Sequence, residues 1–298
     1  MMDCNRREFL KNALNTGAVL ALGMPLSSCS PVDIETSDTA FSLSTPFSID
    51  EFVAKYCPEK AARSDISDAC SDLLQKYKGN IISAGQYGCP PDLLAVALSI
   101  EEERGIERII GDFIGSVRGV DYSAGVAQIM LGRGLGLLAG ISQAKGYAYV
   151  RKQLIGFNKA EAAELGQVLR EYYSNVSKRE ELRKSNEVRK LVEKALVGSP
   201  ELSIEAASFY IGDLSRKLKS AHRISNNDFR TNPIAAYMVL NAYRGGEKEL
   251  DKHRQARHHL DLNQFTLKKL AYIRTGSRIN RMFSGYEYSM IPNRRQRN

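Results

Sequence analysis

The 298-residue chain contains no tryptophan, so Tyr and Phe are left to stack on any ring-shaped ligand. It also has no run of eighteen or more apolar residues, which excludes an ordinary transmembrane helix. Apolar and polar residues rarely alternate, and no segment repeats at a fixed period, so no β-strand and no repeat architecture are expected. These absences leave a helical globular domain as the fold class.

Cysteine is scarce and is not arranged as a metal site. Two of the five cysteines, Cys4 and Cys29, lie in the first 29 residues. The other three allow at most one disulfide and form no CxxC pair; they are Cys57, Cys70 and Cys89. The histidines near the C-terminus have no thiol close to them in the sequence. We therefore expect neither a metal nor a cofactor, and each cysteine is expected to be a small buried residue.

The first 29 residues have the order of features that export requires. Asn5–Lys11 (NRREFLK) matches the twin-arginine pattern, an apolar stretch follows, and Leu26–Cys29 (LSSC) resembles a bacterial lipobox. We expect residues 1–29 to be an export signal with Cys29 as the lipidated residue. The alternative is a basic N-terminal helix in which Cys29 is an ordinary thiol.

The remaining chain divides by composition. Residues 30–48 are rich in Ser, Thr, Asp and Pro, which is typical of a flexible tether. Residues 49–250 form the expected all-α domain of eight or more helices, with 198–200 (GSP) as an internal stop signal. Helices are predicted over 51–56, 65–77, from 90–92 onward, 159–173, 179–197, 204–218 and 233–243. Residues of about 145–200 are a helical insertion with no assigned role, and 251–298 form a basic extension.

Two segments carry the chemistry. Tyr87–Glu102 is an apolar helix that ends in acids, and Asp121–Ile129 contains a Gly-rich turn that ends in Gln128. Helical periodicity places Glu101 and Glu102 almost equally well on the apolar face and makes Glu103 the least suitable. Burial against apolar side chains raises the pKa of a carboxyl, as a general acid requires. The alternative is a solvated helix end whose acids pair with nearby arginines.

Four segments in order resemble the lysozyme-like lytic transglycosylases and goose-type lysozymes. They are YGCPPDLLAVALSIEEE, SAGVAQI, IEAASFYIGDLSRKL and PIAAYMVLNAYRGG, between Tyr87 and Gly246. The resemblance implies a lysozyme-like fold and places the family's catalytic Glu on Glu101, with Glu102 as the runner-up in place of the usual Ser. It also places substrate-binding roles on Gly125, Gln128 and Tyr243.

The implied activity is cleavage of the β-1,4 bond between N-acetylmuramic acid and N-acetylglucosamine in peptidoglycan. In a lytic transglycosylase one Glu donates a proton to the leaving oxygen and then accepts the muramoyl 6-hydroxyl proton, which gives a 1,6-anhydro product. A lysozyme-type hydrolase would use a second acid, Asp112 or Asp121, to hold a water. A non-catalytic glycan-binding lipoprotein on the same fold is a third possibility.

The export signal and the distribution of charge indicate which partners to expect. Residues 251–298 hold eleven Lys and Arg against three acids, an excess equal to the net charge of the whole chain, +8. An exported protein is not expected to meet nucleic acid, so this extension is either a solvated end or a surface for cell-wall peptides or anionic lipid. We expect a periplasmic lipoprotein on the outer membrane, since Ser30 rather than Asp follows Cys29.

Overall fold

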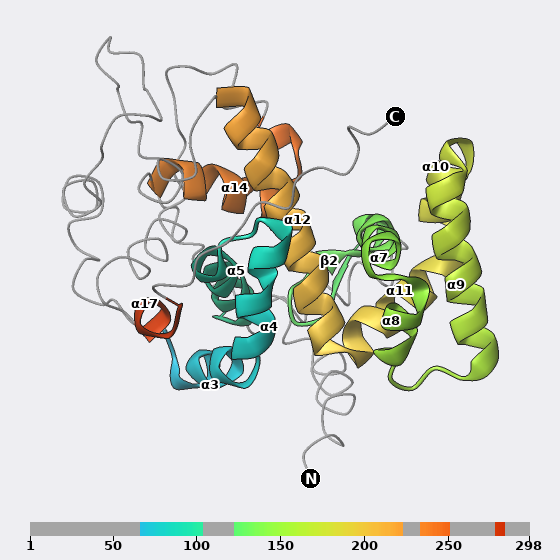
Figure 1. Ribbon diagram of the computed structural model, residues 1–298, viewed down its shortest axis with the longest axis horizontal. Coiled ribbons are helices and arrows are strands. Elements are labelled where there is room, and N and C mark those ends of the chain that lie inside the picture. Colours follow the sequence, from blue (N-terminus) through green and yellow to red (C-terminus); the bar gives the residue numbers. More distant parts are fainter. Residues whose placement is uncertain (1–65, 104–121, 223–232, 251–277, 284–298) are drawn as a thin grey trace, which may run out of the picture. The chain divides into compact units, whose positions relative to one another are not determined.

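Figure 1 shows the computed structural model, in which residues 66–103, 122–222, 233–250 and 278–283 are described. These residues are mostly helical, as the sequence predicts. The α-helices are α3 (Asp68–Lys76), α4 (Lys78–Ser83), α5 (Pro91–Glu103), α7 (Leu131–Lys145), α8 (Tyr147–Lys152), α9 (Lys159–Ser174), α10 (Arg179–Lys184), α11 (Asn186–Gly198), α12 (Pro200–His222), α14 (Pro233–Gly245) and α17 (Arg278–Phe283). Two 3-10 helices are η2 (Ala84–Tyr87) and η3 (Val176–Lys178). Within these ranges no helix combines the length and the apolar character needed to cross a membrane.

The longest helix, α12, is the element against which much of the domain packs. It contacts α4, α5, η2, α7, α11 and α14, and Figure 1 shows it as the long gold helix. Pro200 occupies its first position, where a missing N–H costs nothing, and the Ser199 hydroxyl accepts a hydrogen bond from Leu202 N at 3.2 Å. The expected helix 204–218 is therefore the middle of a longer one.

Helix α5 is buried on almost every side. It begins at Pro91, as expected, after Gly88 turns the chain with a φ of 73°. Every residue from Leu93 to Glu101 is buried, so this helix has no solvent-facing stripe before its last residues. Helices α3, α4, α14 and α17 also pack against it.

A short hairpin corrects the expectation that no strand is present. Strand β1 (Ser123–Ala124) pairs antiparallel with β2 (Ile129–Met130), and Ser123 faces Met130 in the register. Two-residue strands are too short to show an alternating pattern, so periodicity cannot predict them. The residues between them form the turn predicted to carry Gly125 and Gln128.

The Gly-rich start of α7 serves close packing. A Cβ at Gly134 would lie 2.9 Å from Val192 of α11, and one at Gly136 would lie 2.9 Å from the Tyr172 hydroxyl of α9. Glycine lets these helices approach α7 more closely than any other residue would. The part of the chain expected to be an insertion, about 145–200, thus packs on α7.

The helix predicted over 179–197 is two helices. Ser185 adopts an extended conformation, and its hydroxyl accepts a hydrogen bond from Val188 N at 3.4 Å, which caps α11. A Ser inside an amphipathic pattern can either continue a helix or start a new one, because its side chain competes for backbone groups. The stop at Gly198–Pro200 and the helix over 159–173 are confirmed.

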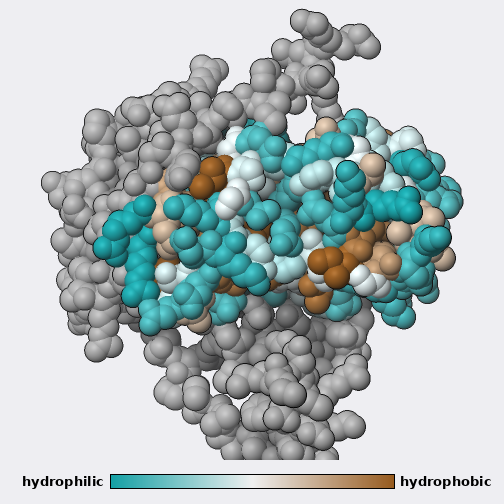
Figure 2. Space-filling view, turned by 60° about the horizontal axis from the view of Figure 1, so that its bottom comes forward, coloured by the Kyte–Doolittle hydropathy of each residue, from teal (hydrophilic) through white to brown (hydrophobic). Residues whose placement is uncertain are grey.

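One element from the basic C-terminal segment is described. Helix α17 contacts α3 and α5, its Ile279 and Phe283 are buried, and Arg278 Nη1 lies 2.5 Å from Asp68 Oδ1. Cys70 and Cys89 are fully buried, as expected of small apolar residues. The signal, the tether, Cys57 and the helix expected over 51–56 lie outside the described residues. Figure 2 shows that the described part of one face is mainly hydrophilic.

The close packing of α12 on η2 gives a test of the fold. A Cβ on Gly212 would overlap the Tyr87 carbonyl oxygen, so Gly212→Ala should lower the free energy of unfolding by about 1–3 kcal/mol. Gly79 of α4 has nothing within 4 Å of its Cβ position, so Gly79→Ala should instead raise it by about 0.5–1 kcal/mol. Urea unfolding followed by circular dichroism measures both. Equal stability of the two variants would contradict this packing.

Candidate functional site

The structure separates the two acids that periodicity left tied. Glu101 is 3% exposed, whereas Glu102 is only partly buried. The burial of Glu101 follows from the crowding of α5, whose neighbours α12, α14 and α17 leave no open face. Of the two candidates, Glu101 is the carboxylate held inside the domain.

Helix α14 brings two consecutive residues to Glu101. Arg244 Nε lies 3.8 Å from Glu101 Oε1, and the Arg244 side chain is 30% exposed. Burial raises the pKa of Tyr243 well above its usual value, and the nearby charge of Glu101 raises it further. Tyr243 and Glu101 were both predicted from the sequence, and the structure brings them together.

The turn between β1 and β2 is held by its own polar groups. Gly125 has a φ of 75°, and a Cβ there would lie 2.6 Å from the Leu196 carbonyl oxygen, so the packing of α11 and α12 requires glycine. Gln128 also has a positive φ, 50°. Its amide nitrogen donates to the Gly125 carbonyl at 2.9 Å, and its amide oxygen accepts from the Ser123 hydroxyl at 2.8 Å. Part of the Gln128 amide therefore stabilises the turn.

The backbone of Ala127 connects this turn to two helices. Its N–H donates to the Ser203 hydroxyl of α12 at 3.2 Å, and its carbonyl accepts a hydrogen bond from the Tyr243 hydroxyl of α14. The resemblance implies that Tyr243 binds substrate. In the structure its hydroxyl proton goes to the Ala127 carbonyl, and the bond places the turn beside the Glu101 end of α5.

A second aromatic group extends the site. Tyr210 of α12 donates to the Ala242 carbonyl at 3.2 Å, and its ring centroid lies 5.7 Å from that of Tyr243. The guanidinium carbon of Arg133 lies 4.4 Å from the Tyr210 centroid. Burial raises the pKa of Tyr210 to about 12, although the charge of Arg133 opposes this shift. Sequence reasoning did not select Tyr210 or Arg133.

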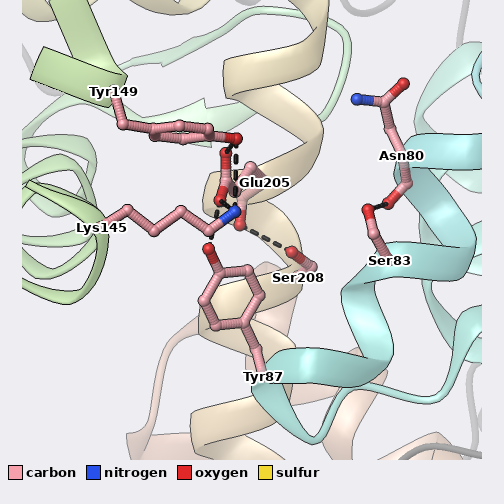
Figure 3. Close-up of polar contacts among 7 residues, drawn as sticks. All are labelled: Asn80, Ser83, Tyr87, Lys145, Tyr149, Glu205 and Ser208. Carbon is pink, nitrogen blue, oxygen red and sulfur yellow. Dashed lines mark hydrogen bonds and ion pairs between the residues drawn. The ribbon is translucent and has the colours of Figure 1, made fainter.

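A separate polar cluster surrounds Glu205 of α12 (Figure 3). The Glu205 carboxylate is 8% exposed and accepts hydrogen bonds from the Tyr87 and Tyr149 hydroxyls, the latter at 2.6 Å, while Lys145 Nζ lies 2.5 Å away. Burial, and then the hydrogen bond and charge of Glu205, raise the pKa of both tyrosines. The donors come from η2, α7 and α8, so one carboxylate joins three elements to α12. No sequence motif pointed to it.

The other predicted site residues cannot be placed. Asp112, Asp121 and Cys29 lie outside the described residues. Within the described ranges, no group of three or more His, Cys, Asp or Glu side chains is placed to hold a metal ion.

Comparison of the chain with protein-family models, with curated proteins and with solved structures finds no significant match. A function must therefore be argued from the residues and their geometry.

Removing the Glu205 carboxylate should destabilise the fold. In Glu205→Gln the new amide N–H groups face hydroxyl donors, and a buried tyrosine hydroxyl loses its acceptor, which costs about 1–3 kcal/mol. Glu164→Gln, on the exposed face of α9, is the control and should change stability by less than about 0.5 kcal/mol. Urea unfolding of both proteins at neutral pH makes the comparison, and equal losses would contradict the proposed role of Glu205.

The buried tyrosines predict a loss of stability in alkali. The folded protein holds the Tyr210 proton up to a pKa of about 12, whereas the unfolded chain releases it near pH 10. The contribution of Tyr210 to the free energy of unfolding is therefore complete below pH 10. It falls by up to about 1.4 kcal/mol per pH unit as the pH rises towards 12. Tyr210→Phe should show a shallower decline than the wild type between pH 9.5 and 11.5 in urea unfolding. Parallel declines would refute this assignment.

Proposed function

We propose that the protein is a peptidoglycan lytic transglycosylase with Glu101 as its single acid/base. The observation that carries the proposal is the burial of Glu101 beside Tyr243, whose hydroxyl bonds the turn that leads to Gln128. These residues come from three of the four segments on which the resemblance to that family rests. Helix α5 carries Glu101, the turn between β1 and β2 carries Gln128, and α14 carries Tyr243. The fourth segment supplies Tyr210, which pairs with Tyr243, and Ser203 directly precedes it on α12 and accepts a hydrogen bond from the turn.

The proposed chemistry needs one carboxyl group. Glu101 gives its proton to the glycosidic oxygen as the bond to C1 of the muramoyl sugar breaks, and the resulting carboxylate accepts the proton of the 6-hydroxyl. That oxygen then bonds to C1 and closes the 1,6-anhydro ring, so no water is consumed. Arg244 would stabilise the carboxylate that exists between the two proton transfers.

The ion pair between Arg244 and Glu101 also supports a second candidate function, a glycan-binding protein that does not cleave its ligand. Arg244 holds the Glu101 carboxylate in an ion pair, a positioning role that requires no proton transfer. The Gln128 amide, which is partly engaged in its own turn, also fits a binding surface that does no chemistry. Either function suits the proposed location, a periplasmic lipoprotein anchored through Cys29 after export.

Digestion of purified cell wall tests the assignment. Wild-type protein should release 1,6-anhydromuropeptides, and Glu101→Gln should reduce the rate by about a hundredfold or more, because general acid–base catalysis contributes on this scale. Glu102→Gln is the matched control, one residue away on the same helix, and should keep most of the activity. Mass spectrometry of the soluble products is the measurement.

The outcomes separate the candidates. Products heavier by one water, with a reducing end, would identify a hydrolase and direct attention to Asp112 and Asp121. Binding to insoluble wall with no soluble product, unchanged in Glu101→Gln, would identify the non-catalytic protein. Loss of activity in Glu102→Gln alone would move the catalytic role to that residue.

A further inference from the structure

Arg133 presents a cation beside the candidate site that no described acid neutralises. Among the described residues, no hydrogen bond or ion pair holds its guanidinium, which is partly exposed and stacks on the Tyr210 ring at 4.4 Å. Tyr210 itself is 4% exposed and bonded to the Ala242 carbonyl. A stacked guanidinium is held at its face and keeps its N–H groups available at its edge.

The surroundings leave room for this side chain. Gly246 follows α14 with a φ of 96°, and a Cβ there would lie 3.2 Å from Arg133 Nη2. Glycine at this position lets the backbone pass close to the guanidinium without covering it. The acids that act on Tyr210 are Asp213 and Glu247, and Lys217 pairs with both.

Arg133 and Glu101 belong to one neighbourhood. The charges of both act on the buried Tyr243 hydroxyl, in opposite directions. Glu101 has Arg244 at 3.8 Å, so the guanidinium beside this carboxylate is that of Arg244 and not that of Arg133. Arg133 therefore contributes a second positive charge to the same neighbourhood.

From this arrangement we propose that Arg133 binds a carboxylate of the substrate and makes the site selective for acidic glycans. This inference rests on the proposed function. In peptidoglycan the chemistry required is a carboxylate attached to the muramoyl sugar, either the free lactyl group of a peptide-free strand or a carboxylate of the attached peptide. Arginine matches a carboxylate with two parallel N–H···O bonds, which lysine cannot form.

Binding of three defined oligosaccharides tests the proposal, with the full mature chain carrying Glu101→Gln so that no probe is cut. The probes are an N-acetylglucosamine oligomer, a peptide-free muramoyl oligomer of equal length, and the same oligomer with its peptides. Adding Arg133→Gln should weaken binding of a carboxylate-bearing probe by about tenfold or more, because charged hydrogen bonds are lost. Affinity for the neutral oligomer should stay within about twofold. Calorimetry measures each Kd.

Two further variants make the result specific. Arg170→Gln, on the exposed face of α9, removes the same unit of charge and should leave all affinities unchanged. Arg133→Lys should recover only part of the lost affinity, because lysine offers a point charge without the planar fork. Unchanged affinity for the neutral oligomer shows that Arg133→Gln is folded.

Each outcome decides one point. Loss with the peptide-free oligomer identifies the lactyl carboxylate as the ligand, and loss only with the peptide-bearing oligomer identifies the peptide. Equal affinities of the Arg133→Gln protein and its parent for all probes, or equal losses in Arg170→Gln, would overturn the inference. Cell-wall digestion by the wild type is a separate result, so failure of the proposed activity and failure of this inference can be distinguished.

Discussion

The arrangement of the candidate site depends on the hydrogen bond from the Tyr243 hydroxyl to the Ala127 carbonyl. This bond joins α14 to the turn between β1 and β2, and the Tyr243 ring lies beside the Glu101 end of α5. A buried hydroxyl and a buried carbonyl each need a partner, and here each satisfies the other. The turn and the end of α5 are thereby held beside α14, whose Tyr243 lies 116 residues after Ala127 in the sequence.

Helix α12 supplies the second constraint, through residues that a purely apolar helix would lack. Ser203 accepts from the backbone of the turn, Gly212 lets η2 approach, and Glu205 gathers donors from three elements. Buried polar groups such as Ser203 and Glu205 cost free energy unless they are hydrogen-bonded. They therefore favour the one arrangement of neighbouring elements that supplies their partners. Because η2 leads into α5, the packing of α12 also determines where Glu101 lies.

The sequence predicted what depends on local pattern and missed what depends on contacts between segments. Periodicity located α5, α9 and α14, because the spacing of apolar residues along a helix is a local signal. The break at Ser185 was missed, since its side chain fits either a continued helix or a cap. Periodicity alone could not choose between Glu101 and Glu102, because the choice depends on which helices cover α5. Ala127 lies 116 residues from its partner Tyr243, and Tyr87 lies 118 residues from its partner Glu205, so no local pattern encodes either contact.

The charges around Glu101 set a requirement that the bound glycan would have to meet. Arg244 Nε lies 3.8 Å from Glu101 Oε1, so a glycan that reaches this carboxyl has to fit beside the guanidinium. A substrate carboxylate at Arg133 would lie next to the Tyr210–Tyr243 ring pair, and Tyr243 lies near Glu101, so this contact would position the muramoyl sugar relative to the Glu101 carboxyl without using Arg244. An acidic glycan would thus be positioned for cleavage by a contact that a neutral glycan cannot make.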